Sequence, residues 1–316
     1  MKISLRETAA VLSAAQKVVI TAHTNPDGDA IGSSLGLMHF LKGLGKDVQV
    51  LIDDDIPAIF DMLPGYELLG KPEEGQNIAA DVLVALDVSL DRIGMVKDVV
   101  DAEVLNIDHH ITNDGAADKL YLDGTCAATA EIIYQLVKEM NGSFSRDCAM
   151  CLYTGLATDS GWFRYSNTTP ETLRAGAELL AAGAEPNLIS EGLERRPYES
   201  LKGLADALQH MELFHDGRVV GVFLDFATLE TIGSAEGLVD MIRKVEGTEL
   251  AVVLKEKEKD SCRVSMRSKG LDVTKIATQF GGGGHVRAAG CSIARPFAEA
   301  KAALLAAIAE AMEPQA

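Results

Sequence analysis

A short polar loop, His23-Thr24-Asn25-Pro26-Asp27-Gly28-Asp29, carries three side chains of the kinds that bind metal ions. It offers one imidazole and two carboxylates within seven residues, a set that suits a divalent ion such as manganese or magnesium. Pro26 and Gly28 allow the loop to turn tightly enough to bring the three side chains together. Because aspartates also cap helices, the loop alone does not decide between a metal site and a helix start.

Further carboxylates and imidazoles follow three other apolar segments. Asp87 comes directly after the apolar run 82–86, and Asp108-His109-His110 follows a run that ends at Ile107. Asp159 comes just past an apolar segment with a helical pattern. Each of these residues has an alternative role in a turn or cap. Two adjacent histidines beside an aspartate are nevertheless unusual as surface residues.

The segments that precede these residues are predicted β-strands. Residues 17–22, 81–86 and 103–107 are short and apolar, whereas 30–44 has a helical pattern that ends at Gly45. Continuous apolar strands separated by helices predict a mostly parallel sheet covered on both faces, and thus an α/β fold. Ligands gather at the carboxyl ends of such strands. We therefore expect the polar clusters to meet at one edge, with ligands for two metal ions about 3.5–4 Å apart.

Three more helices are predicted after these strands, over residues 127–140, 146–157 and 170–182. The run Gly32-Ser33-Ser34-Leu35-Gly36 matches the G-x-S-x-G pattern of serine hydrolases. In those enzymes the serine lies on a sharp turn between a strand and a helix, whereas this run lies inside the predicted helix 30–44. Its small residues are instead expected to permit close packing of the helix on the sheet.

A second group of residues that could bind a ligand is the glycine run Gly281-Gly282-Gly283-Gly284-His285, followed by Arg287. Four residues without side chains allow backbone N–H groups to approach an anion, and the N-terminus of a following helix would add positive charge. His285, Arg287 and Arg267 supply further positive charge. A flexible turn is the alternative, but the flanking cations favour an anion site.

The second half of the chain has a different pattern from the first. Residues 218–226 predict a strand, 250–255 and 262–267 predict a hairpin, and 297–312 predict an alanine-rich helix. This pattern indicates a smaller α/β domain with a mixed sheet. We expect an N-terminal domain over 1–185, a linker over 186–200 and a C-terminal domain over 201–316.

The chain has 316 residues and a formal net charge of −18. Its length is sufficient for two domains with separate cores. Such an acidic chain is poorly suited to binding long duplex nucleic acid, but a short phosphorylated substrate held by a few local cations is compatible with it. No apolar run reaches about 18 residues, so a membrane span is not expected. Five scattered cysteines argue against a disulfide framework, so a cytoplasmic location is expected.

The order of the motifs resembles that of the DHH phosphoesterase superfamily. That order is His-x-x-x-Asp-x-Asp, a strand-end Asp, Asp-His-His, Thr-Asp and Gly-Gly-Gly-Gly-His. The chain is most similar to the nanoRNase type, which degrades very short oligoribonucleotides and dephosphorylates 3′-phosphoadenosine 5′-phosphate. The resemblance covers nearly the whole chain. It implies a DHH catalytic domain followed by a DHH-associated substrate-binding domain.

The resemblance also implies two bound manganese ions, for which magnesium or cobalt are possible substitutes. One ion would be bound by His23, Asp27 and Asp87. The other would be bound by Asp29, Asp87, His109 and Asp159. Asp87 would thus bridge the two ions, and the chain shows no departure from the ligand pattern of the family.

The remaining matching residues would act on the substrate. His110 would contact the substrate phosphate, and Asp108 would orient its neighbours. The glycine run 281–284, His285 and Arg267 would bind the far end of the substrate across a domain cleft. Arg287 is included in this group as a further cation near the glycine run.

The implied activity is hydrolysis of short oligoribonucleotides to mononucleotides, together with removal of the 3′-phosphate of 3′-phosphoadenosine 5′-phosphate. Water activated by two metals would attack the phosphorus atom. The resemblance implies these two kinds of substrate as partners and is compatible with a homodimer. The apolar pattern gives no reason to expect a membrane partner. Three alternatives stay open: a linear or cyclic dinucleotide phosphodiesterase, a manganese inorganic pyrophosphatase, and a nucleotide-binding module without activity.

Overall fold

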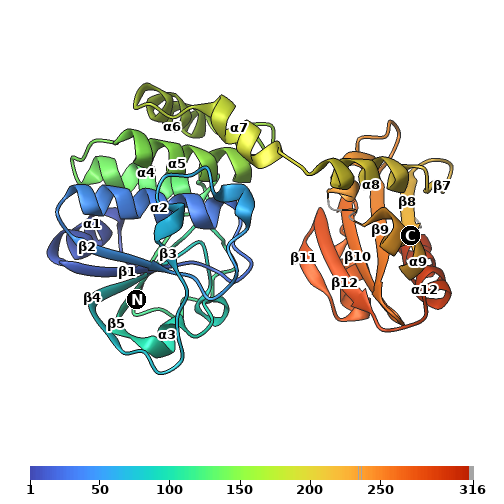
Figure 1. The fold of residues 1–316 in the computed structure, drawn as a ribbon, viewed down its shortest axis with the longest axis horizontal. Helices are drawn as coiled ribbons and strands as arrows, with labels where there is room; N and C mark the ends of the chain where they lie inside the picture. The colour runs from blue at the N-terminus through green and yellow to red at the C-terminus, as the bar shows by residue number, and fades with distance from the viewer. Residues whose placement is uncertain (234, 236, 313–316) are drawn as a thin grey trace. The chain divides into compact units, whose positions relative to one another are not determined.

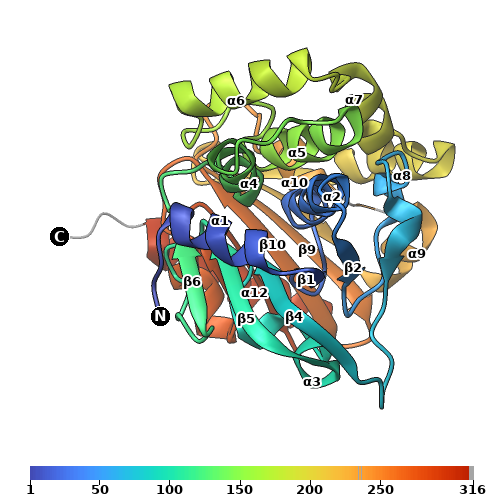
Figure 2. The same cartoon turned by 90° about the vertical axis from the view of Figure 1, so that its left-hand side faces the viewer.

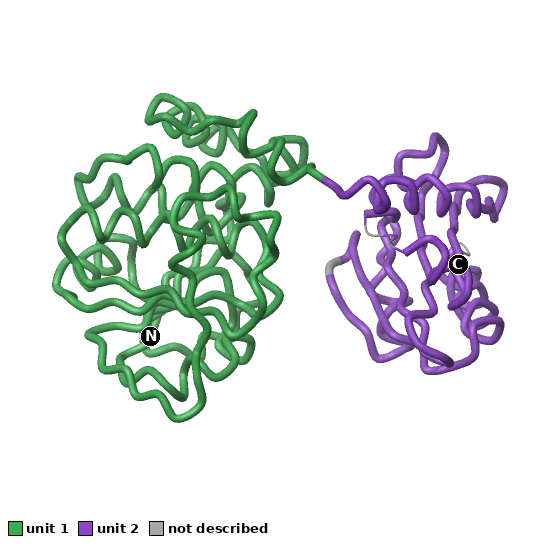
Figure 3. The backbone as a smooth tube through the Cα atoms, viewed as in Figure 1, with its two compact units in different colours: residues 1–195 green, residues 196–316 purple. Residues whose placement is uncertain are grey.

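The computed structural model describes residues 1–233, 235 and 237–312, apart from the side chain of His285. The chain forms two compact units, Met1–Arg195 and Arg196–Ala316 (Figure 3). Helices α7 (Pro186–Glu194) and α8 (Tyr198–Leu208) lie on either side of this division. They occupy most of the segment 186–200 that the sequence pattern left as a linker.

The N-terminal unit is built on a parallel sheet, as the sequence predicts. Its strands are β1 (Lys17–Thr21), β2 (Asp47–Leu51), β3 (Leu69–Gly70), β4 (Ile78–Leu86), β5 (Val100–Asp108) and β6 (Lys119–Leu122). Their order is β3-β2-β1-β4-β5-β6, and every described pairing between them is parallel. From β1 the chain thus adds β2 and β3 on one side of the sheet, and it then continues with β4 on the other side of β1. Ligand sites in open α/β sheets lie at such a reversal of strand order.

Helices cover both faces of this sheet. Figure 2 shows α1, α2, α4 and α5 on one face and α3 on the other, and Figure 1 shows α6 and α7 beyond α5. Their bounds are α1 (Leu5–Ala14), α2 (Gly28–Gly43), α3 (Val96–Val99), α4 (Thr129–Glu139), α5 (Arg146–Asp159) and α6 (Pro170–Ala181). Short 3₁₀ helices occupy Ala58–Phe60, Tyr66–Leu68 and Leu90–Arg92. Neighbouring strand residues pack in opposite directions: Val18 and Ile20 lie in the core on the α2 face, and Val19 lies in the core on the α3 face.

Glycines allow α2 and α5 to pack against each other at very short range. A Cβ atom built on Gly32 would lie only 2.5 Å from the carbonyl oxygen of Cys151, and one on Gly155 would lie 2.8 Å from Asp29 Oδ1. Gly32 and Gly36 of α2 therefore face helix α5. For these two glycines the prediction that they pack on the sheet is wrong, because sequence spacing does not distinguish a helix partner from a sheet partner.

The C-terminal unit contains a mixed sheet, again as predicted. Its strands are β7 (Met211–Phe214), β8 (Val219–Leu224), β9 (Leu250–Glu258), β10 (Ser261–Ser268), β11 (Gly283–His285) and β12 (Ala288–Ile293). Their order is β11-β12-β10-β9-β8-β7, with β8 and β9 parallel and the other pairs antiparallel. One face packs on α8, α9 (Phe226–Ile232) and α10 (Leu238–Ile242). The other packs on α11 (Thr274–Ala277) and α12 (Phe297–Met312).

The glycine run is followed by a strand rather than by the expected helix. Gly283 pairs with Gly290 and His285 pairs with Ala288, so the chain turns back as the hairpin β11–β12. A Cβ atom on Gly282 would overlap the carbonyl oxygen of Gly290, so this approach requires glycine. The prediction of a helix N-terminus after the run is therefore wrong. Among the described residues, no helix has the length and apolar character needed to cross a membrane.

We predict that Gly32→Ala lowers the free energy of unfolding of the N-terminal unit by about 2 kcal/mol or more, because the methyl group forces α2 and α5 apart. Urea denaturation followed by Trp162 fluorescence measures this, since Trp162 is the single tryptophan and lies in this unit. Gly43→Ala, at the end of the same helix and with nothing within 4 Å, is the control and should be stabilising by up to about 1 kcal/mol. Equal effects of the two changes would contradict the packing argument.

Candidate metal centre

The fold places the predicted ligands at one edge of the parallel sheet. His23 follows β1 and Asp87 follows β4, so these two residues flank the reversal of strand order. Asp108 is the last residue of β5, and His109 and His110 come directly after it. The loop after β1 leads into α2, and Asp159 is the last residue of α5. The two helices held together by the glycines thus contribute to the same site as the strands.

Among the residues that the structure describes, three groups of side chains have ligand atoms within 4.8 Å of one another. They are His23, Asp27 and Asp87; Asp29, His109 and Asp159; and Asp87, His109 and His110. All six residues proposed as metal ligands from the sequence belong to the first two groups. Asp87 joins the first group to the third, and His109 joins the second group to the third.

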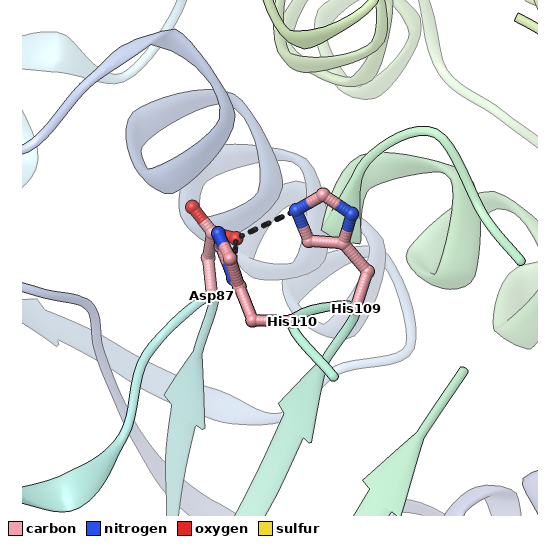
Figure 4. Close-up of side chains that lie close together, drawn as sticks. All are labelled: Asp87, His109 and His110. Carbon is pink, nitrogen blue, oxygen red and sulfur yellow. Dashed lines mark ion pairs between the residues drawn. The ribbon is translucent and has the colours of Figure 1, made fainter. Parts of the chain in front are cut away.

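The two oxygens of Asp87 face different histidines. Oδ2 lies 3.7 Å from His23 Nε2, and Oδ1 lies 3.5 Å from His109 Nε2 (Figure 4 shows the second contact). The side chain is buried, and the Thr129 hydroxyl donates a hydrogen bond of 3.0 Å to Oδ1. The backbone of Asp87 has a φ of +59°, which is uncommon for a residue other than glycine and marks a constrained position. This arrangement gives one carboxylate an oxygen for each of two neighbouring ions.

His23 and His109 are oriented in the same way, each by a backbone carbonyl group. Nδ1 of His23 lies 2.9 Å from the carbonyl oxygen of Thr24, and Nδ1 of His109 lies 3.3 Å from that of Cys126. When Nδ1 carries the proton and donates it to the carbonyl, the lone pair of Nε2 faces carboxylates. Nε2 of His109 is buried and has no hydrogen-bond partner in the described residues, although Asp159 Oδ2 is 3.4 Å away. A cation between them would satisfy both atoms, so the side chains fit a metal ion.

Asp27 and Asp29 also accept hydrogen bonds at the N-termini of helices. Asp27 is the N-cap of α2, where its Oδ1 accepts hydrogen bonds from the N–H groups of Asp29 and Ala30. Asp29 is buried and accepts from the N–H groups of Thr129 and Ala130 at 2.6 and 2.9 Å. These last two groups lie at the N-terminus of α4, which favours negative charge. Helix capping and metal binding are therefore compatible roles for the same carboxylates.

The electrostatics of the cluster favour a bound cation. Burial, together with the charges of Asp87 and Asp159, raises the pKa of Asp29 well above its usual value. Burial also raises the pKa of Asp159 to about 6. Burial opposes the charged form of His23, but hydrogen bonds to Asp27 and Asp87 outweigh it and raise the pKa of His23 to about 10. Several carboxylates and imidazoles crowded out of water in this way bind divalent ions.

His110 differs from His109 because its Nδ1 is engaged by a carboxylate. Nδ1 lies 2.8 Å from Asp108 Oδ1, and this hydrogen bond raises the pKa of His110 to about 9. Asp108 is fully buried, but hydrogen bonds from His110 and Asn113 outweigh the effect of burial and lower its pKa. The His110 side chain is 38% exposed, against 13% for His109, so it is the histidine more accessible to a substrate.

Several residues that support this site were missed by the sequence analysis. Asn113 donates to Asp108 Oδ2 at 2.6 Å and to Asn106 Oδ1 at 2.8 Å. Asn106 in turn donates to the carbonyl oxygens of Ala85 and Val88, next to Asp87. Asn106 interrupts the apolar run Val104-Leu105 and Ile107 of β5, and this polar residue was the signal that the sequence offered. Thr129, which contacts Asp87, had no comparable signal in the sequence.

The C-terminal unit contains the second predicted site, described here by itself. Residues of β10 and β12 line a cavity of about 620 Å³, among them Arg263, Ser265 and Arg267 from β10 and Ala288, Gly290 and Ser292 from β12. Phe280, Gly281, Gly282 and Gly283 also form part of its wall. Arg263 and Ser265 were missed, although their spacing from Arg267 places all three on one face of a strand.

Gly284, His285 and Arg287 were also predicted to belong to this second site. Gly284 and Arg287 are outside the described lining of the cavity, and Arg287 is exposed. Gly284 has a φ of +138° and supports the hairpin turn. The side chain of His285 lies outside the described residues.

Comparison with known proteins connects both units to one family. The N-terminal domain of the DHH family matches residues 17–156, and the DHHA1 domain matches residues 222–313. A relative in Thermus thermophilus, named bifunctional oligoribonuclease and PAP phosphatase NrnA, is 37% identical over 294 residues. That match covers 92% of this chain and 88% of the relative.

Solved structures agree with this assignment. An exopolyphosphatase-related protein from Bacteroides fragilis superimposes with a TM-score of 0.91 at 26% identity, covering 97% of this chain and 95% of that one. The RecJ protein of Thermus thermophilus in complex with Mn²⁺ shares the fold, with a TM-score of 0.54 at 15% identity. That match covers 98% of this chain and 55% of RecJ. The chain therefore belongs to the DHH family of phosphoester hydrolases and resembles its NrnA type.

Proposed function

We propose that the chain is a manganese-dependent phosphoesterase. It would hydrolyse short oligoribonucleotides to mononucleotides and remove the 3′-phosphate of 3′-phosphoadenosine 5′-phosphate. The observation that carries this proposal is the position of Asp87, whose two oxygens face His23 Nε2 and His109 Nε2 at 3.7 and 3.5 Å. The substrates follow from the NrnA relative, whose name states an oligoribonuclease and PAP phosphatase activity.

Two divalent ions fit the ligand groups on either side of Asp87. His23 and Asp27 would bind one ion, and Asp29, His109 and Asp159 the other, with Asp87 between them. Such a pair lowers the pKa of a nearby water and stabilises negative charge on phosphoryl oxygens. Manganese is proposed because the set mixes imidazole and carboxylate ligands and because the RecJ structure of the same fold is a complex with Mn²⁺.

His110 is proposed to bind the phosphoryl group. Its pKa of about 9 keeps it protonated at neutral pH, and Asp108 fixes the orientation of its ring through Nδ1. A cationic donor held in this way stabilises the charge that develops on a phosphoryl oxygen. Asn113 holds Asp108 in turn, so the donor does not have to reorganise during the reaction.

The C-terminal cavity is proposed to bind the nucleotide. Arg263 and Arg267 provide guanidinium groups for phosphate, and the glycines leave the backbone open to close approach. These cations are local exceptions in a chain with a net charge of −18. The overall acidity opposes the binding of long polyanions and thus favours short substrates.

Product analysis on a ladder of oligoribonucleotides, two to about ten residues long, tests the proposed function. With manganese, we expect mononucleotide products and the fastest turnover on the shortest chains, together with phosphate release from 3′-phosphoadenosine 5′-phosphate. Pyrophosphate and a cyclic dinucleotide are included as comparison substrates. A preference for either of these, or for long DNA, would overturn the substrate assignment.

In the same assay, Asp87→Asn should lower kcat/KM by about 10³-fold or more, because it removes a negative ligand shared by both ions. Asparagine tolerates the positive φ of this position, so the variant changes charge with little effect on the backbone. Asp101→Asn, at the exposed start of β5, is the matched control. Near-normal turnover by Asp87→Asn would refute the proposed site.

Metal binding is predicted to release protons at neutral pH. In the metal-free protein His23 is protonated below its raised pKa of about 10, and it must lose that proton to bind a metal ion. Manganese affinity should therefore rise with pH over the range 6 to 9, by about tenfold per pH unit for each proton displaced. Calorimetric titration in buffers of different ionisation enthalpy measures the release. Binding that is independent of both buffer and pH would contradict this assignment.

Arg267→Met should raise KM for a diribonucleotide by about tenfold and leave kcat within about threefold, because it removes a binding contact that does not depend on the reaction step. Arg295→Met, in the same unit but outside the cavity, should behave as the wild type. Steady-state kinetics with manganese separates the two parameters. A loss in kcat with unchanged KM would show that the cavity does not act through binding.

A further inference from the structure

Segment 126–130 leads into helix α4 and is buried along its whole length. No residue of this segment was predicted from the sequence to belong to the metal centre. Buried backbone N–H and C=O groups need hydrogen-bond partners, so the partners of this segment show what it holds and what holds it. One set of partners lies at the metal centre, and the other set lies in α4 and just before α6.

The N-cap residue of α4 is Ala128, whose side chain cannot cap the helix. Asp29 of α2 takes this role and accepts hydrogen bonds from the N–H groups of Thr129 and Ala130 at 2.6 and 2.9 Å. Both of these donors belong to segment 126–130. The position of the Asp29 carboxylate therefore depends on the position of this segment.

The same segment contacts two more of the residues proposed to bind the second ion, which are Asp29, Asp87, His109 and Asp159. The Thr129 hydroxyl donates to Asp87 Oδ1 at 3.0 Å, and Oδ1 is the oxygen that faces His109. The carbonyl oxygen of Cys126 lies 3.3 Å from His109 Nδ1. Segment 126–130 therefore contacts three of the four proposed ligands of this ion.

The proposed ligands of the first ion are held by local contacts instead. His23 is oriented by the carbonyl group of Thr24, which is the next residue. Asp27 accepts hydrogen bonds from two N–H groups in the first turn of α2. The Asp87 oxygen that faces His23 is Oδ2, whereas segment 126–130 contacts Oδ1. Different parts of the chain therefore hold the two halves of the site.

Two side chains away from the ligands hold the segment, and both act on Ala127. Glu131 Oε2 accepts from the Ala127 N–H group at 2.9 Å and from the Thr172 hydroxyl at 2.9 Å. The Asn167 amide donates to the carbonyl oxygen of Ala127 at 3.1 Å and to that of Asp159 at 3.2 Å. Glu131 is 2% exposed, and a carboxyl group buried in this way requires such partners.

We propose that Glu131 and Asn167 are positioning residues for the second metal ion and act on it through segment 126–130. Loss of either contact lets the segment shift, which weakens the ion beside His109 and Asp159 and leaves the first ion in place. Residues that hold metal ligands in this way contribute about 10- to 100-fold to metal affinity. The presence of the two ions rests on the proposed function, whereas the arrangement of the segment does not.

Glu131→Leu tests the proposal, because it removes the acceptor for the Ala127 N–H group. Titration of the metal-free, full-length protein with Mn²⁺, followed by the electron paramagnetic resonance signal of the free ion, gives the number of bound ions and their dissociation constants. We expect two ions in the wild type. In the variant one dissociation constant should rise about tenfold or more, and the other should stay within about threefold. Anomalous peaks in crystals of the variant grown with manganese identify the retained ion, which we expect beside His23 and Asp27.

Asn167→Ala removes the other contact and should cause the same selective loss. Because Asn167 is partly exposed, this variant tests the segment without placing an apolar side chain where a buried carboxyl group was.

Glu131→Gln is the conservative variant. Burial raises the pKa of Glu131, so its surroundings disfavour the charged form and suit a neutral amide. Since glutamine keeps an acceptor oxygen, both ions should bind within about threefold of the wild type. Glu139→Leu, the same substitution as the first at an exposed residue of α4, is the matched control and should bind both ions as the wild type does.

Equal weakening of both ions in Glu131→Leu would overturn the positioning role, as would normal binding of both. A Glu131→Gln variant as weak as Glu131→Leu would also overturn it. Two ions in the wild type without turnover of oligoribonucleotides would refute the proposed substrates alone. Fewer than two ions in the wild type would refute the proposed metal centre and this inference together.

Discussion

Four carboxylates in this protein lie close together, and two of them are buried. Asp29 and Asp87 are buried, and Asp27 and Asp159 complete the cluster with His23 and His109. Burial and the repulsion between like charges in a low-dielectric environment explain why the pKa values of Asp29 and Asp159 are raised. The fold must therefore hold the carboxylates in place until cations neutralise them.

Backbone groups hold most of these carboxylates and histidines in place. N–H groups at the start of α2 bind Asp27, and N–H groups at the start of α4 bind Asp29. Backbone carbonyl groups orient His23 and His109. The close packing of α2 on α5 through glycines brings Asp29 and Asp159 to the same site. These contacts pre-organise the ligands, so the binding of a metal ion costs little rearrangement.

The sequence predicted the parallel sheet, the mixed sheet and the cluster of ligands, because each depends on a local pattern. Apolar runs predict the strands, and the rule that ligands lie at carboxyl strand ends brings His23 and Asp87 together. The features that the sequence did not predict depend on contacts between residues that are distant in the chain. Thr129 reaches Asp87 only through the packing of α4, and the partner of Gly32 could not be known before α5 was placed. A helix start was expected after the glycine run at residue 281, whereas the end of the run forms a strand. The pairing of Gly283 with Gly290 could not be predicted, because glycines carry no side chains that would show the periodic pattern of a strand.

The central claim is that two metal ions bind on opposite sides of Asp87. Crystals of the protein grown with manganese, measured at the manganese absorption edge, test it most directly. We predict two anomalous peaks about 3.5–4 Å apart, one beside His23 and Asp27 and the other beside His109 and Asp159, with Asp87 bound to both. A single peak, or peaks that Asp87 does not touch, would contradict it.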